Sequence, residues 1–388
     1  MIKRKQKNKN FAMEQDSGQK IEFEKETGQK SPFLFVKKKL VAICIALGVL
    51  VAVAAVVAGF VFIGNNGSES NPDEQFVTED QKTEFRHPLT GAKIDLQIES
   101  LPRVFAVMIE NAADSWPQAG LEDAFLVIEA PVEASIPRFV AFYSEEDSVE
   151  KIGPVRSARP YYLDWSSELD SMYAHVGGSP ESISLIPSII GVLDLNEFYN
   201  APFFWRSSDR SAPHNVYTSI DLLRNAFQKR TERATVGEPS YEPWIFADSA
   251  EPEGRGNFSQ AEIRLAPPTY TIIWRYDKET NKFERRHGSF PHKSEDGDRI
   301  YSDNVVIVET DVSVLDAVGR RKIRTTGEGN AILLQNGFEK SVKWKKEKRS
   351  DRLRFFDSET GEEMRMNAGK TWIEIVPSLE IVVSNAGN

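Results

Sequence analysis

Two arginines three residues apart give this sequence its clearest chemical signal. Arg156 and Arg159 belong to the segment Gly153-Pro-Val-Arg-Ser-Ala-Arg-Pro160, which has a proline near each arginine. Proline fixes its own backbone angle and disfavours helix at the residue before it, so the segment is predicted to be a rigid, extended loop. Guanidinium groups make two-point contacts with carboxylates and phosphates. We therefore expect Arg156, Ser157 and Arg159 to bind an anion.

A structural role for the two arginines is the alternative. The surrounding part of the chain is strongly acidic, and paired arginines are common in folded domains. The arginines would then pair with carboxylates of the same module, such as Glu129, Glu133 or Asp164. A third candidate ligand, Arg138, lies in the segment Pro137-Arg-Phe139. The sequence supports an anion site and an ion-pair network equally well.

A glycine pair follows the arginine loop, in the segment that begins at His175. A strand is predicted to end before Gly177 and Gly178, which allow a tight turn and a close approach of the backbone to a ligand. Ser179 is placed to cap the helix that follows. Amide groups at a helix start favour an anion, so these four residues are candidate ligands. An ordinary capped helix that binds nothing is the alternative.

Aromatic and basic side chains gather between residues 203 and 217. Phe203-Phe-Trp-Arg206 is followed by Ala212-Pro-His-Asn215. Aromatic rings beside arginines suit sugar or peptide recognition, and His214 can act as a general base near neutral pH. Arg206, His214 and Asn215 are therefore candidate ligand-binding residues. The aromatic rings themselves are expected in the core, and His214-Asn215 would also serve as turn residues.

No standard catalytic or metal-binding arrangement is complete in this sequence. The five histidines include no His-x-x-x-His pair, and a zinc site would need scattered ligands, so we expect no metal and no cofactor. A Ser–His–Asp triad would lack the Gly-x-Ser-x-Gly turn that supports one. Nucleic-acid binding is disfavoured because residues 88–253 carry 12 basic and 26 acidic side chains.

Membrane attachment is predicted by residues 40–63, a run of 24 residues without a charged side chain. A helix of that length crosses a hydrocarbon core of about 30 Å. A cleaved signal peptide has a shorter apolar core, so we expect a retained anchor. Residues 1–39 hold eleven basic and five acidic side chains, and residues 64–87 hold two and six. The positive-inside rule then leaves the N-terminus in the cytoplasm and residues 64–388 outside the cell membrane.

The single cysteine, Cys44, lies inside the predicted span, so the exported residues can form no disulfide. The residues before it do not fit a lipobox, because Ile43 is bulky where a small residue is needed. We therefore expect no lipid on Cys44.

The rest of the chain divides into a linker and two modules. Residues 64–87 are polar, acidic and poor in aromatic residues, so a flexible linker is expected after the basic cytoplasmic tail of residues 1–39. Residues 88–250 are strongly acidic and residues 251–388 are nearly balanced, with Pro, Gly and Ser gathered near the boundary. Two exported domains are therefore expected.

The first module alternates strand and helix patterns. Runs rich in Val, Phe and Ile predict strands at residues 103–109, 124–130 and 137–143. Helical spacing predicts helices at residues 160–171, 182–190 and 218–229. Thr218 is expected to cap the last of these helices. The predicted fold class of this module is mixed α/β, within an α+β chain.

The second module shows almost only strand patterns. Residues 270–276 and 282–286 flank a turn and predict a hairpin. Further strands are predicted at residues 305–309, 331–335, 342–346, 352–356 and 371–376. Asn336-Gly337 marks a turn between two of them. A smaller, mainly antiparallel β domain is therefore expected after the α/β domain.

Several motifs resemble the YerB-like lipoproteins, a bacterial family that comprises domain of unknown function 3048 and its separate C-terminal domain. The motifs are Ala106-Val-Met-Ile-Glu-Asn111, Pro117-Gln-Ala-Gly-Leu121, Ile152 to Tyr161, Ala174 to Pro180, Ala212-Pro-His-Asn215, Pro291-His292, Ser302 to Val306 and Gly369 to Ile373. The resemblance implies an extracytoplasmic, membrane-attached protein without an established activity. Family members often attach through a lipidated cysteine, whereas this chain has a predicted transmembrane helix. They also usually carry a glycine pair where this chain has Ala134-Ser135, and this difference leaves the role of that loop open.

Two functions follow from these features, beside a purely structural alternative in which the first module is a scaffold whose arginines only neutralise its acids. The leading hypothesis is a non-enzymatic envelope protein that binds a cell-wall component or an envelope protein through the arginine-rich candidate residues. The alternative is an envelope enzyme, a transferase or hydrolase acting on a phosphorylated or cell-wall substrate. In the enzyme, His175 or His214 would be the base, and the arginine loop would stabilise negative charge. The incomplete catalytic set favours binding over turnover.

Overall fold

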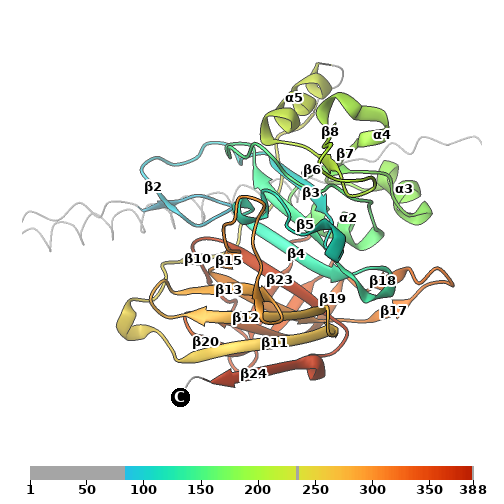
Figure 1. The fold of residues 1–388 in the computed structure, drawn as a ribbon. Helices are drawn as coiled ribbons and strands as arrows, with labels where there is room; N and C mark the ends of the chain where they lie inside the picture. The colour runs from blue at the N-terminus through green and yellow to red at the C-terminus, as the bar shows by residue number, and fades with distance from the viewer. Residues whose placement is uncertain (1–83, 233–235, 387–388) are drawn as a thin grey trace, which may run out of the picture. The chain divides into compact units, whose positions relative to one another are not determined.

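The computed structural model describes residues 84–232 and 236–386 (Figure 1). The basic tail predicted at residues 1–39, the span predicted at residues 40–63 and residues 64–83 of the predicted linker lie outside the described residues. Within the described part of the chain, no helix is long and apolar enough to cross a membrane.

A ten-stranded sheet contains five strands from residues 84–232 and five from residues 236–386. From one edge to the other, its strands are β21 (Arg354–Asp357), β20 (Phe338–Lys346), β19 (Gly327–Gln335), β16 (Asn304–Glu309), β23 (Thr371–Val376), β4 (Leu126–Pro131), β5 (Pro137–Ser144), β3 (Val104–Ile109), β6 (Ser171–His175) and β7 (Val192–Asn196). β4 and β23 pair in parallel, with Glu129 opposite Glu374. Strands from before and after residue 250 therefore share one sheet.

Both faces of the central sheet are covered. The strand β3 shows which sequence pattern a strand needs when it is buried on both faces. All six of its residues are buried. Val104, Ala106 and Met108 belong to one hydrophobic core, whereas the three residues that alternate with them belong to a second core. Successive side chains of a strand point to opposite faces, so a strand covered on both faces needs a continuous apolar run.

Short helices cover the first half of the sheet. They are α2 (Pro160–Ser167), α3 (Pro180–Leu185), α4 (Glu197–Asn200) and α5 (Ile220–Thr231). α2 places Tyr162 and Trp165 in the first core, and α5 places Ile220 and Leu223 in the second. The two helices therefore lie on opposite faces of the sheet.

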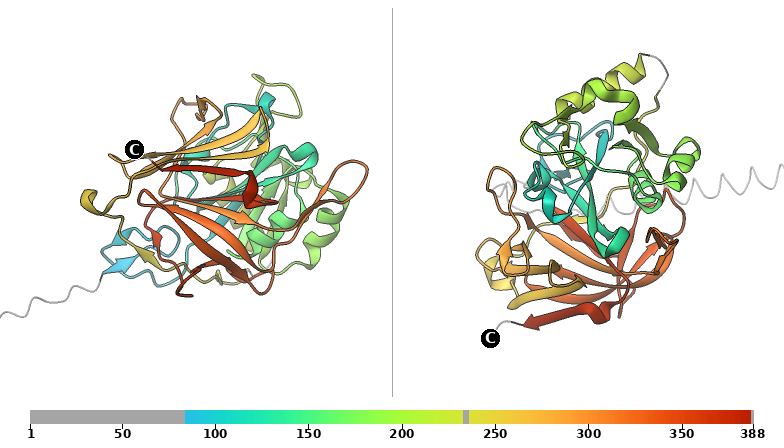
Figure 2. Two further views of the ribbon diagram at one scale, coloured as in Figure 1. Left: turned by 90° about the horizontal axis from the view of Figure 1, so that it is seen from below. Right: turned by 45° about the vertical axis from the view of Figure 1, so that its right-hand side comes forward.

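An antiparallel sheet covers the second half, on the face that α5 also covers. Its strands are β14 (Phe290–Pro291), β13 (Lys282–His287), β12 (Tyr270–Asp277), β11 (Phe258–Ala266) and β24 (Val382–Ala386), with β15 (Tyr301–Ser302) paired to β13. Trp274 and Phe283 of this sheet lie in the same core as Trp372 of β23. Figure 2 shows this sheet as a separate layer beside the central one.

Four short strand pairs complete the described strands. They are β1 (Phe85–Arg86) with β2 (Lys93–Ile94), β8 (Trp205–Arg206) with β9 (Val216–Tyr217), β10 (Phe246–Ala247) with β22 (Met366–Asn367), and β17 (Val312–Val314) with β18 (Arg321–Ile323). The β17–β18 hairpin reaches the first half of the chain, where Arg321 Nη2 donates a hydrogen bond to Ser135 Oγ at 2.7 Å.

The expected mixture of helices and strands is confirmed, and the described structure is rich in strands. The predicted hairpin is present as β12 and β13, and Asn336-Gly337 forms the predicted turn with both residues at positive φ. The parallel pairing of β16 with β23 was not predicted, because the sequence pattern of a strand does not name its neighbour.

The predicted helix boundaries need three corrections. The first helix ends at Ser167 instead of 171, because β6 begins at Ser171. The second begins at Pro180 and ends at Leu185, where a 3-10 turn containing Pro187 follows. The third is capped by Ser219, whose Oγ accepts a hydrogen bond from the Leu222 amide at 3.2 Å. The expected cap, Thr218, is buried and donates to the Phe203 carbonyl instead.

Candidate functional site

The arginine loop, residues 153–160, is held in place by backbone hydrogen bonds to three parts of the first half of the chain. The Arg156 amide donates to Met108 O of β3, and Arg156 O accepts from the Val176 amide that follows β6. The Val155 amide donates to Val216 O of β9. These bonds to strands fix the position of each arginine on the loop. The predicted extended conformation agrees with this pattern.

Arg156 and His214 meet at one buried carboxylate, Glu110, which directly follows β3. Arg156 Nε lies 2.9 Å from Glu110 Oε1, and His214 Nδ1 lies 2.7 Å from Glu110 Oε2. The Arg156 Nε–H does not point at a hydrogen-bond acceptor, so the first contact is an ion pair without an aligned hydrogen bond. We call Glu110, Arg156 and His214 the Glu110 cluster.

The Glu110 cluster leaves two polar groups available to solvent. The side chains of Arg156 and His214 are 22% and 23% exposed, whereas that of Glu110 is 4% exposed. Within residues 84–232 and 236–386, neither His214 Nε2 nor the two Nη atoms of Arg156 have a hydrogen-bond partner. The buried carboxylate thus orients an imidazole nitrogen and a guanidinium fork toward solvent.

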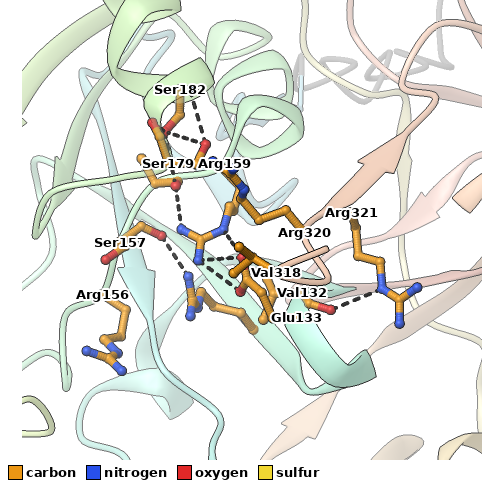
Figure 3. A network of polar contacts seen from close by, with 12 residues as sticks. Val132, Glu133, Arg156, Ser157, Arg159, Ser179, Ser182, Val318, Arg320 and Arg321 are labelled. Carbon is orange, nitrogen blue, oxygen red and sulfur yellow. Dashed lines mark hydrogen bonds and ion pairs between the residues drawn. The ribbon is translucent and has the colours of Figure 1, made fainter. Parts of the chain in front are cut away.

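Arg159 pairs with Glu133 (Figure 3), and the charge of Arg138 also acts on this acid; we call the three residues the Glu133 cluster. Arg159 contacts Glu133 with two hydrogen bonds, from Nε to Oε1 at 2.8 Å and from Nη2 to Oε2 at 2.9 Å. Burial acts to raise the pKa of Glu133, but Arg159 outweighs it and the net pKa is lowered. Arg138 Nη1 donates to Ser157 O at 2.9 Å. The acid that pairs with Arg159 is therefore Glu133, and not Glu129 or Asp164.

Ser179, at the start of α3, makes its hydrogen bonds within the fold. Ser179 Oγ caps α3, as predicted, by accepting from the Ser182 amide at 3.2 Å, and the Ser179 amide donates to Ala158 O. Gly177 has a left-handed φ of +58°, and its amide donates to Asn196 Oδ1. A Cβ on Gly178 would lie 2.6 Å from Ser182 Oγ. The glycine pair therefore serves a tight turn and close packing.

His175 is inside the core and has no free nitrogen. Its side chain is 0% exposed. Nδ1 lies 2.7 Å from Gly177 O, and Nε2 lies 2.7 Å from Asp194 Oδ1. Both nitrogens face acceptors of the protein, so His175 is not placed to take a proton from a bound substrate.

Arg206 and Asn215 lie beside the Glu110 cluster in the sequence but make other contacts. Arg206 is 46% exposed and pairs with Glu197 at 3.0 Å. Its Nη1 also donates to Asn215 Oδ1 at 3.2 Å, and Asn215 Nδ2 donates to Ser207 O. Asn215 therefore stabilises the turn that carries His214. All three nearby rings were expected in the core; Phe204 is buried there, whereas Phe203 and Trp205 are only partly buried.

The sequence did not predict a fully buried polar network between the two sheets. Arg285 of β13 contacts Glu129 of β4 through Nη2 at 2.8 Å from each carboxylate oxygen, and both side chains are 0% exposed. Glu374 of β23 lies next to Glu129 and accepts a hydrogen bond from Trp274 Nε1 at 2.8 Å. Burial, and then the charge of Glu129, raise the pKa of Glu374 well above its usual value. Burial also raises the pKa of Glu129, although Arg285 acts against this rise, so Arg285 pairs with one carboxylate while its neighbour favours the protonated form.

The network continues toward the Glu110 cluster. Arg285 Nη1 donates to His292 Nδ1, and His292 Nε2 donates to Gln118 Oε1, both at 2.8 Å. Gln118 Nε2 donates to Glu110 O at 2.9 Å and to Asn111 Oδ1 at 3.1 Å. Burial, and then His287 and Arg285, lower the pKa of His292 well below its usual value, so His292 is neutral. Glu110 and Asn111, adjacent in the chain, therefore connect the exposed cluster to the buried network.

Two further sets of residues bear on function. Within the described residues, no group of three or more His, Cys, Asp and Glu side chains is placed to hold a metal ion. A surface pocket of about 880 Å³ is lined by residues from both halves of the chain, among them Asp170, Tyr241 and Arg352. None of the predicted site residues lines this pocket.

Comparison with known proteins identifies the family. Residues 89–233 match the family model described as "Protein of unknown function (DUF3048) N-terminal domain", and residues 262–373 match its C-terminal domain. The protein described as "Putative lipoprotein YerB" of Bacillus subtilis is 30% identical over 312 residues, which are 79% of this chain and 91% of that protein.

A solved structure agrees with this comparison. The crystal structure of the YerB protein from Bacillus subtilis matches with a TM-score of 0.67 at 28% identity, and the match covers 78% of this chain and 99% of that one. The motifs that suggested the resemblance include Glu110-Asn111, Gln118, the arginine loop, His214 and His292, which the structure brings into contact. This chain belongs to the DUF3048 family of YerB-like proteins.

Proposed function

We propose that this chain is a membrane-attached, extracytoplasmic accessory protein that binds an anionic component of the cell envelope through the Glu110 cluster. One observation carries the proposal: a buried carboxylate holds Arg156 and His214 so that their outer nitrogens face solvent without a partner in the described structure. Donors that are fixed in advance lose little freedom on binding, and a guanidinium fork fits carboxylate and phosphate groups.

The attachment is part of the proposal. Residues 40–63 would form a single-pass anchor with the N-terminus in the cytoplasm, and residues 88–250 and 251–388 would form the two exported modules. The apolar run and the charge difference across it support this arrangement. Protease added to intact spheroplasts should digest the exported modules and spare residues 1–39. Complete protection of the modules would contradict the orientation.

Binding is tested with purified cell-wall fractions and the full-length chain. We expect wild type to sediment with the wall fraction, and Arg156→Ala and His214→Ala to lose at least about tenfold in affinity, since a hydrogen bond to a charged group contributes about 1.5 to 3 kcal/mol. Arg264→Ala is the matched control, because Arg264 is exposed and pairs with Glu262 on the second sheet. Equal binding by all four proteins, or no binding by wild type, would overturn the proposal.

A second candidate function is an envelope enzyme that acts on a phosphorylated or cell-wall substrate. The favouring observation is the 2.7 Å contact between Glu110 and His214 Nδ1, which leaves Nε2 available as a general acid or base. Arg156 would then stabilise negative charge on the substrate. Turnover of a polyprenyl pyrophosphate that is lost in His214→Gln would favour the enzyme. Binding without turnover would favour the accessory protein.

A further inference from the structure

Within the described residues, Arg138 carries a positive charge that no carboxylate contacts directly, although the charge of Glu133 acts on it. The residue is 8% exposed, and its one hydrogen bond goes from Nη1 to the neutral carbonyl of Ser157. In the part of the chain that the structure describes, no carboxylate forms an ion pair with Arg138. Burial, and then the charge of Arg159, lower the pKa of Arg138. A buried guanidinium without an acidic partner is unfavourable, so this position suits an anion from outside.

Glu133 occupies the place beside Arg138 where such an anion would bind. Its carboxylate fills the guanidinium fork of Arg159 with two hydrogen bonds, although its own side chain is 26% exposed. Arg156 points away from this pair, as Figure 3 shows, and belongs to the Glu110 cluster. A phosphoryl group that replaced Glu133 would face two guanidinium groups, Arg159 and Arg138.

Glu133 lies on a turn whose backbone is strained. It begins the 3-10 turn Glu133–Ser135 between β4 and β5, and Ala134 and Ser135 have left-handed φ values of +56° and +57°. Residues other than glycine adopt this region at a cost. The turn is held from outside by Arg321 of β18, which donates to Val132 O and Ser135 Oγ. Glu133 is therefore carried by the turn between β4 and β5 and by neither strand.

We propose that Arg138 and Arg159 form a binding site for a phosphoryl group, and that Glu133 is a built-in competitor that leaves when the phosphoryl group binds. A dianion matches the two positive charges that remain once Glu133 has moved, whereas a monocarboxylate neutralises only one of them. This site is separate from the Glu110 cluster, so it stands or falls independently of the proposed function.

Calorimetric titration of the full-length chain with inorganic pyrophosphate tests the site. Glu133→Gln removes the negative charge of the competing side chain. We expect this variant to bind pyrophosphate about tenfold more tightly than wild type does. Arg138→Met should lose pyrophosphate binding and melt at a temperature no lower than wild type, since it removes an uncompensated buried charge. Arg264→Ala should bind pyrophosphate as wild type does, because Arg264 pairs with Glu262 on the second sheet and belongs to neither cluster.

Glu181→Gln is the matched control for the loss of one acid, because Glu181 pairs with Arg320 and does not contact Arg159. We expect its affinity to be unchanged. An equal gain in Glu181→Gln and Glu133→Gln would show a general charge effect and overturn the site. Retained binding in Arg138→Met, a lower melting temperature of that variant, or acetate binding as tight as pyrophosphate would each overturn it as well.

The source of the phosphoryl group is distinguished by a vesicle arm. Glu133→Gln should sediment with phosphatidic acid vesicles and not with phosphatidylcholine vesicles if the ligand is a lipid headgroup. Binding of free pyrophosphate without vesicle binding would identify a soluble or wall-borne phosphate. Absence of both would overturn the proposal.

Discussion

Arg285 and Arg156 each pair with a carboxylate in or next to the central sheet, but they differ in burial and in how many of their nitrogens have a partner. Arg285 is 0% exposed, and its contacts with Glu129 and His292 engage all three of its nitrogens. Arg156 is 22% exposed, has one ion pair with Glu110 and presents its outer nitrogens to solvent. Complete pairing stabilises a buried site, whereas incomplete pairing at the surface leaves groups that a ligand can use.

A carboxylate beside an arginine has a different role in each of the two regions. Glu129 lies between two sheets, so its arginine comes from a strand 156 residues away and joins the second sheet to the first. Glu110 lies where β3 ends, so its partners come from loops. Loops on a rigid scaffold are the usual place for binding residues.

Removing the buried carboxylate is expected to have the largest effect on stability. Glu129→Ala removes the acid that hydrogen-bonds to Arg285 and leaves only the longer contact with Glu374 at 3.9 Å, so we expect the free energy of unfolding to fall by about 3 to 5 kcal/mol. Urea unfolding of the full-length chain measures this change. Glu110→Ala is the comparison, and it should cost clearly less, because Arg156 and His214 can turn to solvent. Equal losses would remove the distinction between the two regions.

Raising the pH above 4.5 should destabilise the buried network through Glu374. Its pKa in the folded protein is well above the ordinary value of 4.5, so the folded state holds a proton that the unfolded state has lost. Its contribution to stability is full below pH 4.5 and falls as pH rises toward the folded pKa, by up to about 1.4 kcal/mol per pH unit. Glu374→Gln should flatten the pH dependence of the unfolding free energy. An unchanged slope would contradict a protonated Glu374.

The strained turn at Glu133 predicts a stabilising substitution. Ala134→Gly should raise the free energy of unfolding by about 1 kcal/mol, because glycine adopts left-handed φ without the steric cost that alanine has. Ser135→Gly should gain less, since it also removes the hydroxyl that accepts a hydrogen bond from Arg321. Thermal melts of both variants test the order. A loss of stability in Ala134→Gly would show that the turn is not strained.

The smallest effect on stability is expected for Arg156. Arg156→Ala should change the free energy of unfolding by less than about 1 kcal/mol, because Arg156 is partly exposed and Glu110 keeps its contact with His214. Urea unfolding, done beside the wall-binding assay, shows whether binding and stability separate. A loss comparable to that of Glu129→Ala would assign Arg156 a structural role.

Much of the local structure was predictable because it depends on local patterns. The apolar runs of β3, β4 and β5 and the hairpin of β12 and β13 lie close to their predicted places. Ser179 caps α3 because its hydroxyl is one turn from the amide that it accepts. Helix ends were less accurate, since the start of β6 and the position of Pro187 ended helices that the pattern would continue.

The candidate site was only partly predictable. Arg156 and His214 belong to two separate groups in the sequence, and Glu110 stands out only as part of a family motif. Nothing in the spacing of residues 110, 156 and 214 indicates that one carboxylate contacts both other side chains. The family motifs were the available signal, because they include all three residues.

By itself, the sequence determined the family, the mixture of helices and strands, and the types of residue that can hold an anion, because these follow from composition, short-range pattern and motifs. Only the tertiary structure decided that β4 pairs with β23, that His175 is enclosed, and that Arg156 and Arg159 face different acids. The physical reason is that strand pairing and burial depend on which distant segments meet, and a local pattern carries no information about that choice.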